Sequence, residues 1–577
     1  DFWAMPDFSA FGPTIEAHSK GLELVNNVFM EFSSHGSSYK ELKVKVVDVG
    51  WGIERLSWFT KGLPNIYEVA FGDVMNKLRE MIGLEYDEDF LNNYAIYAGQ
   101  LNIEDISDLK EARKMVASKL NVSIEEVNKK ISPLEALYAI ADHSRALAFA
   151  ISDGALVSNV GGGYNLRVIL RRALSFLENF GWHLELEEVA LFHVKYLKKI
   201  FPELKESEDE IVKIIKVEKE RYKQAKQNAE RIIRNLDKSK ISEEDLIKLY
   251  ESHGITPEQL GIDVPKDFYK NITERHLGYR KVEEKKYAID VEGLPPTKIL
   301  YYKEPAIFKF RAKILKISGK YVILDQTAFY PESGGQKSDN GYIENIKVLN
   351  VQKIGKVIVH ELDGELNKKV GDLVFCEVDK KRREILTKHH DAIHVISGAA
   401  RKVLGKHIHQ FGAEKDVDKA RIDLTHFENL NQDQIKKIED LANQIVKKNL
   451  SIKKIIMDRG KAESKYGFDI YAGGYVPSKQ IRIINIGNGF DIEACSGTHG
   501  NRTKDIGWIK IIKSKRVADG LVRLEIVAGD LAENFLREKE KILKLLSKEL
   551  GVNEEKVPLA VENLFKKWKE LRKRLRG

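Results

Sequence analysis

Two short histidine-containing stretches constrain the fold of this 577-residue chain more than any other feature. The stretch "TKHHDAIHVISG" spaces His390 and His394 as HxxxH, and "EACSGTHG" spaces Cys495 and His499 as CxxxH. Residues four apart on a helix share a face, so HxxxH directs two imidazoles toward one point. A tetrahedral set of sulfur and nitrogen ligands suits zinc best. The pattern therefore predicts a fold that brings two distant segments together around one ion.

Spacing alone leaves a simpler interpretation open. Ordinary helices carry histidines four apart, and His389 beside the pair shows that the segment is locally rich in histidine. If a metal binds, Asp391 and Glu493 are candidates to accept hydrogen bonds from the imidazoles and fix their tautomers. The other cysteine, Cys376 in "DLVFCEVD", is expected to pack in a strand.

The bulk composition excludes several classes of protein. A length of 577 residues is too great for one hydrophobic core and predicts roughly three or four domains. Charged residues make up 32% of the chain, and no apolar run approaches the roughly 20 residues of a membrane span. The start "DFWAMPDFSAFGP" lacks the features of a signal peptide, and two cysteines do not make a disulfide framework. We therefore expect a cytoplasmic protein with no membrane partner.

The hydrophobic period changes along the chain, and each change marks an expected domain boundary. A helix-like run, "GLELVNNVFMEF", and a strand, "KVKVVDVGWG", precede a long helical region that includes "SPLEALYAIADHSRALAFAIS" after a Ser-Pro start. After "EGLPPTK", the segment "IFKFRAKILKISGKYVILDQ" alternates on both sides of a Ser-Gly turn, as barrel strands do. The expected class is multidomain α+β, with a mixed part at 1–75, a helical part at 76–290, a β-barrel at 291–380, an α/β part at 381–515 and a helical arm at 516–577.

Four motifs in order identify a family. "TAFYPESGGQ", "HHDAIH", "HIHQFGAEKD" and "CSGTH" resemble the editing domain of alanyl-tRNA synthetases and of free-standing editing proteins. The resemblance implies that the paired histidines, Cys495 and His499 bind zinc, and that Thr327 and Gln410 hold the mischarged amino acid. Ser496 replaces the first Gly of the family's usual Cys-Gly-Gly-Thr-His. In "SGGQ", which could also be an ordinary hairpin loop, glycines permit close backbone approach to a ligand and Gln336 can donate and accept hydrogen bonds.

The activity that this resemblance implies is hydrolysis of the ester between a wrong amino acid, chiefly serine or glycine, and the 3′ end of tRNA. A pocket shaped for the methyl group of alanine rejects such side chains only weakly, so a second, hydrolytic site is needed. Zinc would orient the tRNA end or polarise water. Four protein ligands leave no open position, so the alternatives are a water that replaces one ligand and a purely positional metal.

The first part of the chain resembles the catalytic domain of class II synthetases. "VVDVGWGIERLSWFTKG" is similar to motif 3, which binds ATP with Mg²⁺, and the matching positions are Gly50, Gly52, Glu54 and Arg55. Asp48 corresponds to the aspartate that holds the alanine ammonium group, and Asn26 to another pocket position. Motifs 1 and 2 are not found, so we expect either a fragment of a longer protein or a synthetase completed by a separate N-terminal catalytic chain.

A third segment resembles the tRNA-recognition domain of the same family. It reads "DHSRALAFAISDGALVSNVGGGYNLRVILRRALSF". The resemblance implies that Asn159 reads the G·U pair of the tRNA(Ala) acceptor stem, with Glu251 standing for the family's aspartate. Arg167, Arg171 and Arg172 lie at i, i+4 and i+5 of an expected helix and would face acceptor-stem phosphates.

The expected architecture is therefore a class II catalytic remnant, a helical tRNA-recognition domain, a β-barrel with an α/β zinc editing domain, and a C-terminal helical arm. The complete protein would attach alanine to tRNA(Ala), whereas this chain alone would bind tRNA and edit. The alternatives are a free-standing editing hydrolase, a noncatalytic tRNA-binding module with structural zinc, and a multidomain scaffold.

Overall fold

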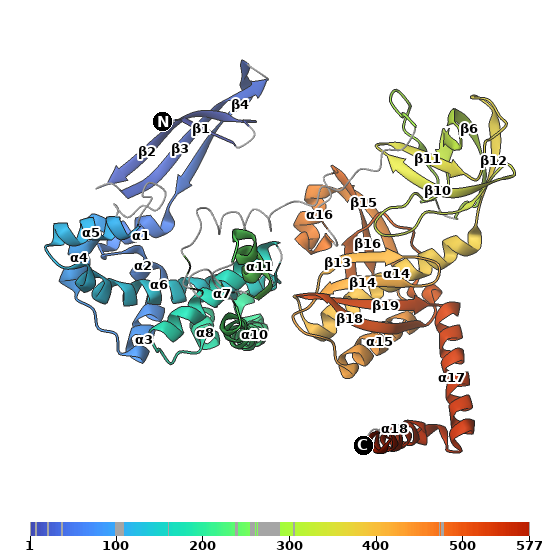
Figure 1. The fold of residues 1–577 in the computed structure, drawn as a ribbon. Helices are drawn as coiled ribbons and strands as arrows, with labels where there is room; N and C mark the ends of the chain where they lie inside the picture. The colour runs from blue at the N-terminus through green and yellow to red at the C-terminus, as the bar shows by residue number, and fades with distance from the viewer. Residues whose placement is uncertain are drawn as a thin grey trace. The chain divides into compact units, whose positions relative to one another are not determined.

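The computed structural model of the chain describes residues 2–5, 8–19, 22–35, 38–98, 109–159, 161–236, 241–253, 255, 260, 262, 289–303, 306–471, 474 and 478–575. The chain forms two compact units, Asp1–Val157 with Gly162–Tyr269 and Ser158–Gly161 with Lys270–Gly577. Figure 1 colours the first unit from blue to green and the second from green to red. Within the described ranges, no helix is both long enough and apolar enough to pass through a bilayer.

The first unit opens with an antiparallel sheet in the order β1-β2-β3-β4 (Figure 1). Its strands are β1 Phe2–Ala4, β2 Phe11–Ser19, β3 Leu22–His35 and β4 Ser38–Trp51. The strand predicted from "KVKVVDVGWG" is confirmed by β4, which ends at Trp51. The helix expected for "GLELVNNVFMEF" is wrong, because the described residues of that run, Leu22–Phe32, lie in β3. Val25 pairs with Ala17 on one side and with Trp51 on the other. This pairing along both edges overrides the local helical spacing.

Helices make up the rest of the described first unit. They are α1 Ile53–Lys61, α2 Ile66–Phe71, α3 Asp73–Ile82, α4 Glu88–Ala98, α5 Leu109–Leu120, α6 Ile124–Ser152, α7 Gly161–Asn179, α8 Leu186–Leu197, α9 Pro202–Glu206, α10 Glu208–Arg234 and α11 Glu243–His253. The expected Ser-Pro start of α6 is wrong, because the helix begins earlier, where the Ser123 hydroxyl accepts a hydrogen bond from the Glu126 N–H at 3.1 Å. Pro133 lies inside the helix. Helix α6 packs against α8 and α10. The domain boundary predicted at residue 75 falls inside α3.

The second unit begins with the closed barrel that the alternating pattern predicts, in the strand order β10-β11-β7-β6-β12-β9. The strands are β6 Lys309–Ser318, β7 Tyr321–Leu324, β9 Gly341–Ile343, β10 Ile346–Ile354, β11 Val357–Leu362 and β12 Leu373–Val378, with a short parallel pair, β5 Lys298–Ile299 and β8 Gln326–Thr327, beside them. The Ser-Gly turn is confirmed between β6 and β7, where Gly319 takes a φ of 55°. Cys376 is fully buried in β12, and burial raises the pKa of its thiol to about 12.

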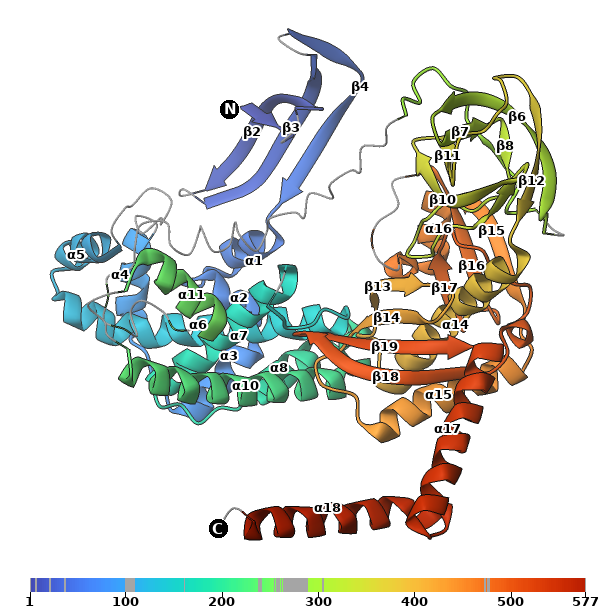
Figure 2. The same ribbon diagram turned by 45° about the vertical axis from the view of Figure 1, so that its right-hand side comes forward.

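A four-stranded sheet, β13-β14-β19-β18, and a three-stranded sheet, β15-β16-β17, follow the barrel. Helices α14 and α15 cover one face of the larger sheet in both views (Figures 1 and 2). The elements are α14 Lys380–Leu404, β13 Gln410–Lys415, β14 Ala420–Thr425, α15 Gln432–Lys447, β15 Ile452–Asp458, α16 Arg459–Tyr466, β16 Gln480–Ile486, β17 Asp491–Ala494, β18 Ile509–Ala518 and β19 Leu521–Ala528.

The boundary predicted at residue 515 does not separate two structural parts, because it falls inside β18. Strand β19 pairs with β14, and its Leu524 and Ile526 are fully buried in the core under α14. The helical arm therefore starts later than expected, with α17 Asp530–Leu550 and α18 Val557–Arg574. Both helices confirm the helical character predicted for the C-terminal segment.

Candidate metal centre

Helix α14 supplies two of the predicted ligands. It starts at Asp379, whose carboxylate accepts a hydrogen bond from the Arg382 N–H at 3.0 Å. From His389 to Ala400 every residue is buried. The HxxxH spacing places His390 and His394 on one helix face, with ring centroids 5.4 Å apart, as the sequence predicts.

The loop after β17 supplies the other two ligands. Strand β17 pairs with β16, so Cys495 is placed at the end of the smaller sheet, and its N–H donates to the Arg482 carbonyl at 3.0 Å. Gly497 passes so close to the helix that a Cβ there would lie 2.0 Å from Cε1 of His390. Glycine at this position is therefore required for the loop to bring Cys495 and His499 against α14.

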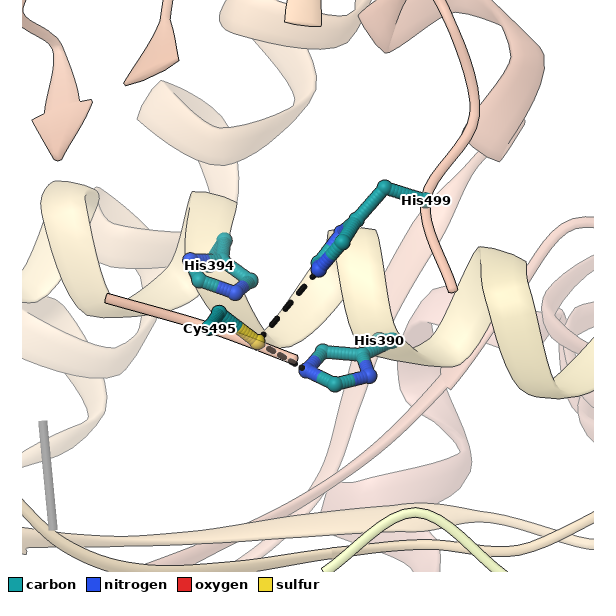
Figure 3. A group of neighbouring side chains, drawn as sticks. All are labelled: His390, His394, Cys495 and His499. Atoms are coloured by element: carbon teal, nitrogen blue, oxygen red, sulfur yellow. Dashed lines mark hydrogen bonds between the residues drawn. The ribbon is translucent and has the colours of Figure 1, made fainter. Parts of the chain in front are cut away.

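The four predicted ligand side chains meet in space (Figure 3). One ligand atom from each of His390, His394, Cys495 and His499 lies within 4.8 Å of every other. The Cys495 sulfur is 3.2 Å from Nε2 of His390 and 3.4 Å from Nε2 of His499. Zinc bonds of about 2.3 Å to sulfur and about 2.0–2.1 Å to nitrogen would separate such ligands by roughly 3.5 Å in a tetrahedron. The cluster is therefore close to the dimensions of a tetrahedral metal site.

Hydrogen bonds fix the tautomer of each imidazole. Nδ1 of His390 lies 2.7 Å from Oε1 of Gln336, and that oxygen also accepts from the Thr498 N–H at 3.1 Å. Nδ1 of His394 lies 2.8 Å from the Asp491 carboxylate, and Nδ1 of His499 lies 2.7 Å from Asp391.

Because each Nδ1 faces an acceptor, the neutral form of each ring carries its hydrogen on Nδ1 and presents a lone pair at Nε2. Three lone pairs and one thiol sulfur thus converge in a buried space. Only a proton or a cation can satisfy such a set. The two carboxylates and the amide are the hydrogen-bonded supports that metal-binding histidines ordinarily have.

The surroundings shift the pKa values of the ligand residues in different directions. Burial, together with the positive charge of Lys415, holds the pKa of His390 well below its ordinary value. Burial opposes charge on His394 as well, but the carboxylates of Glu493 and Asp491 raise its pKa well above the ordinary value. Burial alone would raise the thiol pKa of Cys495, yet the hydrogen bond and charge of His394 lower it. Thiolate at Cys495 is the ligand form that a metal needs.

The residues predicted to accept hydrogen bonds from the imidazoles, Asp391 and Glu493, both lie beside a ligand, but they are not the full set. Asp391 does accept from a ligand, His499, and its second oxygen accepts from the Gly500 N–H at 2.9 Å. Glu493 lies 3.2 Å from Nδ1 of His394 but shares that atom with Asp491, which sequence reasoning missed. The alternation that runs along β17 to Cys495 puts 491, 493 and 495 on one face, and it is the signal that could have identified Asp491.

A loop of the barrel reaches into the centre. Residues 333–337 lie against β13, with Gln336 in a parallel bridge to Lys415. A Cβ on Gly335 would lie 1.9 Å from the Ala413 carbonyl oxygen, so this glycine lets the loop approach the backbone of β13 closely. The approach that the sequence suggested was to a ligand, and it stays a prediction. The ammonium group of Lys415 is buried and donates to the Gly334 carbonyl at 2.9 Å. No pattern in the sequence pointed to this lysine.

The two residues expected to hold the amino acid lie in different environments. Thr327 is fully buried at β8, where its Oγ1 is 2.9 Å from Nε2 of His360. Nδ1 of His360 donates to the Val322 carbonyl at 3.1 Å, so Nε2 accepts the Thr327 hydroxyl hydrogen. Burial lowers the pKa of His360 to about 4, consistent with a neutral ring. Gln410 is half-buried at the start of β13.

The residues expected to contact tRNA are also in different environments. Arg167 is buried in a bidentate ion pair with Glu218, with Nη2 2.9 Å from Oε1, and so it lies inside the helical unit rather than on an exposed basic face. Arg171 is half-buried, and burial followed by the charge of Arg167 lowers its pKa. Arg172 is exposed, and its guanidinium carbon lies 5.6 Å from the ring centroid of Phe176.

Two further predicted tRNA contacts lie near helix ends. Asn159 is exposed just before α7. Glu251 falls in the last turn of α11, and its side chain lies outside the described residues.

The residues expected to bind ATP and alanine gather at one end of the first sheet. Asn26 pairs with Gly50 and Val28 pairs with Asp48, so Asn26 and Asp48 point to the same face. Nη2 of Arg55 lies 3.3 Å from Glu23. A Cβ on Gly52 would lie 2.4 Å from Nε of Arg55, so this glycine leaves room for the guanidinium at the start of α1.

Comparison with known proteins connects these features to a family. The family described as "tRNA synthetases class II (A)" matches residues 13–382, and "Threonyl and Alanyl tRNA synthetase second additional domain" matches residues 481–525. The second match includes β16 from Ile481 onward, β17, Cys495 and His499. The first covers more than half of the chain.

Curated relatives carry a more specific name. The alanine–tRNA ligase of Nitrosopumilus maritimus is 42% identical over 564 residues, which cover 96% of this chain and 62% of that protein. The alanine–tRNA ligase of Methanococcus maripaludis strain C7 is 39% identical over 583 residues, or 97% of this chain and 65% of that protein. That of Thermococcus kodakarensis is 39% identical over 600 residues, again 97% and 65%. The chain thus spans 62–65% of the length of these relatives. It belongs to the class II tRNA synthetase family, and the curated proteins that it resembles are alanine–tRNA ligases.

Proposed function

We propose that this chain is the tRNA-binding and editing portion of an alanine–tRNA ligase, and that it hydrolyses seryl- and glycyl-tRNA(Ala) at the metal centre. The names of the relatives and the match to the second additional domain support this assignment. The observation that carries it is the convergence of three Nε2 lone pairs and the Cys495 sulfur, each imidazole being held at Nδ1 by a buried acceptor.

Zinc is the metal that this centre fits best. The donor set of three imidazoles and one thiolate is typical of zinc, and hard cations such as Mg²⁺ prefer oxygen ligands. His390, His394, Cys495 and His499 would hold the ion. When bound, zinc supplies a positive charge that orients the tRNA terminus and polarises a nearby oxygen.

The chain's own residues would select the mischarged amino acid. The hydroxyl of Thr327 is already engaged with His360 of the barrel strand β11, so Thr327 would act by shaping the site beside the barrel. Gln410, half-buried on β13, would contact the amino acid directly and favour the hydroxyl of serine. A site built to hydrogen-bond a hydroxyl discriminates strongly against a methyl group, since its polar groups are left unpaired by the wrong substrate.

The ATP-dependent attachment of alanine would belong to the complete protein. In that protein Asn26, Asp48, Gly50, Gly52 and Arg55 would bind alanine and ATP with Mg²⁺. The acceptor stem would lie on the helical unit, against Asn159, Glu251, Arg171 and Arg172, while Arg167 would hold α7 to α10 through Glu218. A separate N-terminal catalytic chain and a cytoplasmic location stay predictions.

The corresponding domain layout is a catalytic part followed by a helical tRNA-recognition domain, a barrel, a zinc editing domain and an arm. The strand pair that ends at Ala528 is assigned to the editing domain because it shares a sheet with β14.

Hydrolysis of seryl-tRNA(Ala) by the purified chain tests the proposal. We expect stoichiometric zinc and rapid release of serine, with slow release of alanine from alanyl-tRNA(Ala). His390→Ala should lose both zinc and hydrolysis, whereas His183→Ala, at an exposed histidine in the other unit, should retain both. A wild-type rate no faster than spontaneous hydrolysis would refute the editing assignment.

A second candidate is a noncatalytic tRNA-binding module with structural zinc. The observation that favours it is that four protein ligands leave no open coordination position. It predicts tRNA binding without hydrolysis, and loss of folding rather than of catalysis when the metal is removed.

A further inference from the structure

Arg482 lies beside the metal centre without belonging to it. It is half-buried on β16, and its Nη1 donates to the carbonyls of Cys495 at 3.0 Å and Gly497 at 2.9 Å. Its guanidinium carbon lies 4.4 Å from the ring centroid of Tyr302. The hydroxyl of Tyr302 in turn donates to the Ser496 carbonyl. The cation is therefore held rigidly against the loop that carries the sulfur ligand.

The guanidinium keeps a free binding edge. Both hydrogens of Nη1 are directed at neutral carbonyls, and among the residues described by the structure no acceptor is found for Nε or Nη2. Among the described residues, the contacts found for this side chain are the two carbonyls and the Tyr302 ring, and none is a carboxylate. The Nε–Nη2 edge is the side of a guanidinium that binds an oxyanion through two parallel hydrogen bonds.

The surroundings of Arg482 suit a nucleotide chain. Ile456 pairs with Arg482 on the outer strand β15, and its side chain is 67% exposed. Ser496 lies between the two residues whose carbonyls Arg482 binds, and its hydroxyl lies 3.4 Å from that of Ser333. An oriented cation flanked by an exposed apolar side chain and by hydroxyl groups can take a phosphate together with the faces of adjacent sugars or bases.

We propose that Arg482, stacked on Tyr302, binds a backbone phosphate of the single-stranded 3′ end of tRNA beside the metal centre. This inference rests on the proposed function, because it names the part of the substrate that this subsite takes. The aminoacyl ester itself carries an ammonium group and no carboxylate, so the positive charge of Arg482 would repel it. A phosphate of the tRNA backbone has the opposite charge and is therefore the expected partner. Arg482 is thus a positioning residue for the ester.

Equilibrium binding of tRNA(Ala), compared with the same tRNA lacking its single-stranded 3′ end, tests the proposal without requiring hydrolysis. Arg482→Gln should weaken binding of the intact tRNA by about 10- to 100-fold, the range for a hydrogen bond to a charged group. The slope of log Kd against log salt concentration should fall by about 0.7, as expected when the protein neutralises one single-strand phosphate fewer. Binding of the trimmed tRNA should not change, and Arg482→Lys should restore part of the affinity.

Hydrolysis gives a second readout. Arg482→Gln should raise KM for seryl-tRNA(Ala) and leave the rate on 3′-O-seryl-adenosine, which has no phosphate, unchanged. Lys513→Gln removes one charge from an exposed lysine of the larger sheet and serves as the matched control. Zinc content should equal that of the wild type in every variant.

Two results would overturn the inference. One is an equal effect of Arg482→Gln on intact and trimmed tRNA. The other is a loss of zinc or of activity on seryl-adenosine, which would make Arg482 only a clamp for the Cys495 loop. Absence of hydrolysis by the wild type would refute the editing assignment instead, and the binding comparison would still decide the role of Arg482.

Discussion

Gln336 is the buried amide through which the barrel supports a ligand of the metal centre, and Gln336→Leu should weaken metal binding. Its Oε1 accepts from Nδ1 of His390 at 2.7 Å and from the Thr498 N–H at 3.1 Å, and its Nε2 donates to the Thr498 hydroxyl at 2.9 Å. The side chain is fully buried. Leucine is similar in size but offers neither acceptor nor donor.

The magnitude follows from the two donors that leucine leaves without an acceptor. Each buried unsatisfied donor costs about 1–3 kcal/mol, so the variant should be destabilised by about 2–6 kcal/mol in all. The part that concerns His390 should appear in the metal affinity, because removal of a support to a metal-binding histidine typically lowers affinity about 10- to 100-fold. The part that concerns the Thr498 N–H should appear in the stability of the protein without metal.

Competition with a chromophoric zinc chelator measures the first part, and denaturant unfolding of the metal-free protein measures the second. Gln336→Glu keeps an oxygen for both donors and should retain most of the zinc affinity. Gln352→Leu is the matched control. Gln352 is half-buried on β10, and the hydrogen bonds that its Nε2 donates are long, at 3.3 Å. Wild-type zinc affinity in Gln336→Leu would refute the argument that this amide fixes the His390 tautomer.

Three further predictions concern the metal, a buried ion pair and a buried histidine. Removal of zinc with a chelator should lower the melting temperature of the second unit, because a ligand that binds only the native state stabilises it. Zinc but not Mg²⁺ should restore that temperature, as measured by differential scanning calorimetry. Equal recovery with Mg²⁺ would contradict the assigned donor set. Glu218→Gln should lower the free energy of unfolding by about 3–5 kcal/mol, because it leaves the buried Arg167 without its charge partner. Arg172→Gln, on the same helix as Arg167, should lower it little. Equal effects of the two variants in urea unfolding would show that the Arg167–Glu218 ion pair is not buried as described. Burial lowers the pKa of His360 to about 4, so below the ordinary value of about 6.5 the unfolded chain binds a proton that the native barrel does not. The free energy of unfolding should therefore fall by about 3 kcal/mol as the pH drops from about 6.5 to about 4, and His360→Gln should be less sensitive over that range; parallel pH profiles of the two proteins would reject the assignment.

Some features could be predicted from the sequence because they depend on spacing along one segment. The alternating pattern of the barrel hairpin has the period of a strand, and the turn at Gly319 uses a backbone conformation that glycine adopts readily. The HxxxH spacing places two imidazoles on one helix face whatever the helix packs against. The ordered motifs also indicated the family to which the known relatives belong.

Other features depended on contacts between distant segments, and spacing does not encode them. The run "GLELVNNVFMEF" has helical spacing, but its residues from Leu22 onward lie in a strand, because partners on both sides take up the backbone hydrogen bonds. Arg167 belongs to a basic run in the sequence, yet it is buried because α10 brings Glu218 to it.

The sequence therefore determined which residues are candidate ligands, and the tertiary structure decided the tautomer of each imidazole. Residue type and spacing identify His390, His394, Cys495 and His499 as a possible set. Which nitrogen of each imidazole faces the centre depends on the acceptors that Gln336, Asp491 and Asp391 present to Nδ1. A hydrogen bond of 2.7–2.8 Å requires both atoms to be placed by packing, and packing is a property of the whole folded unit.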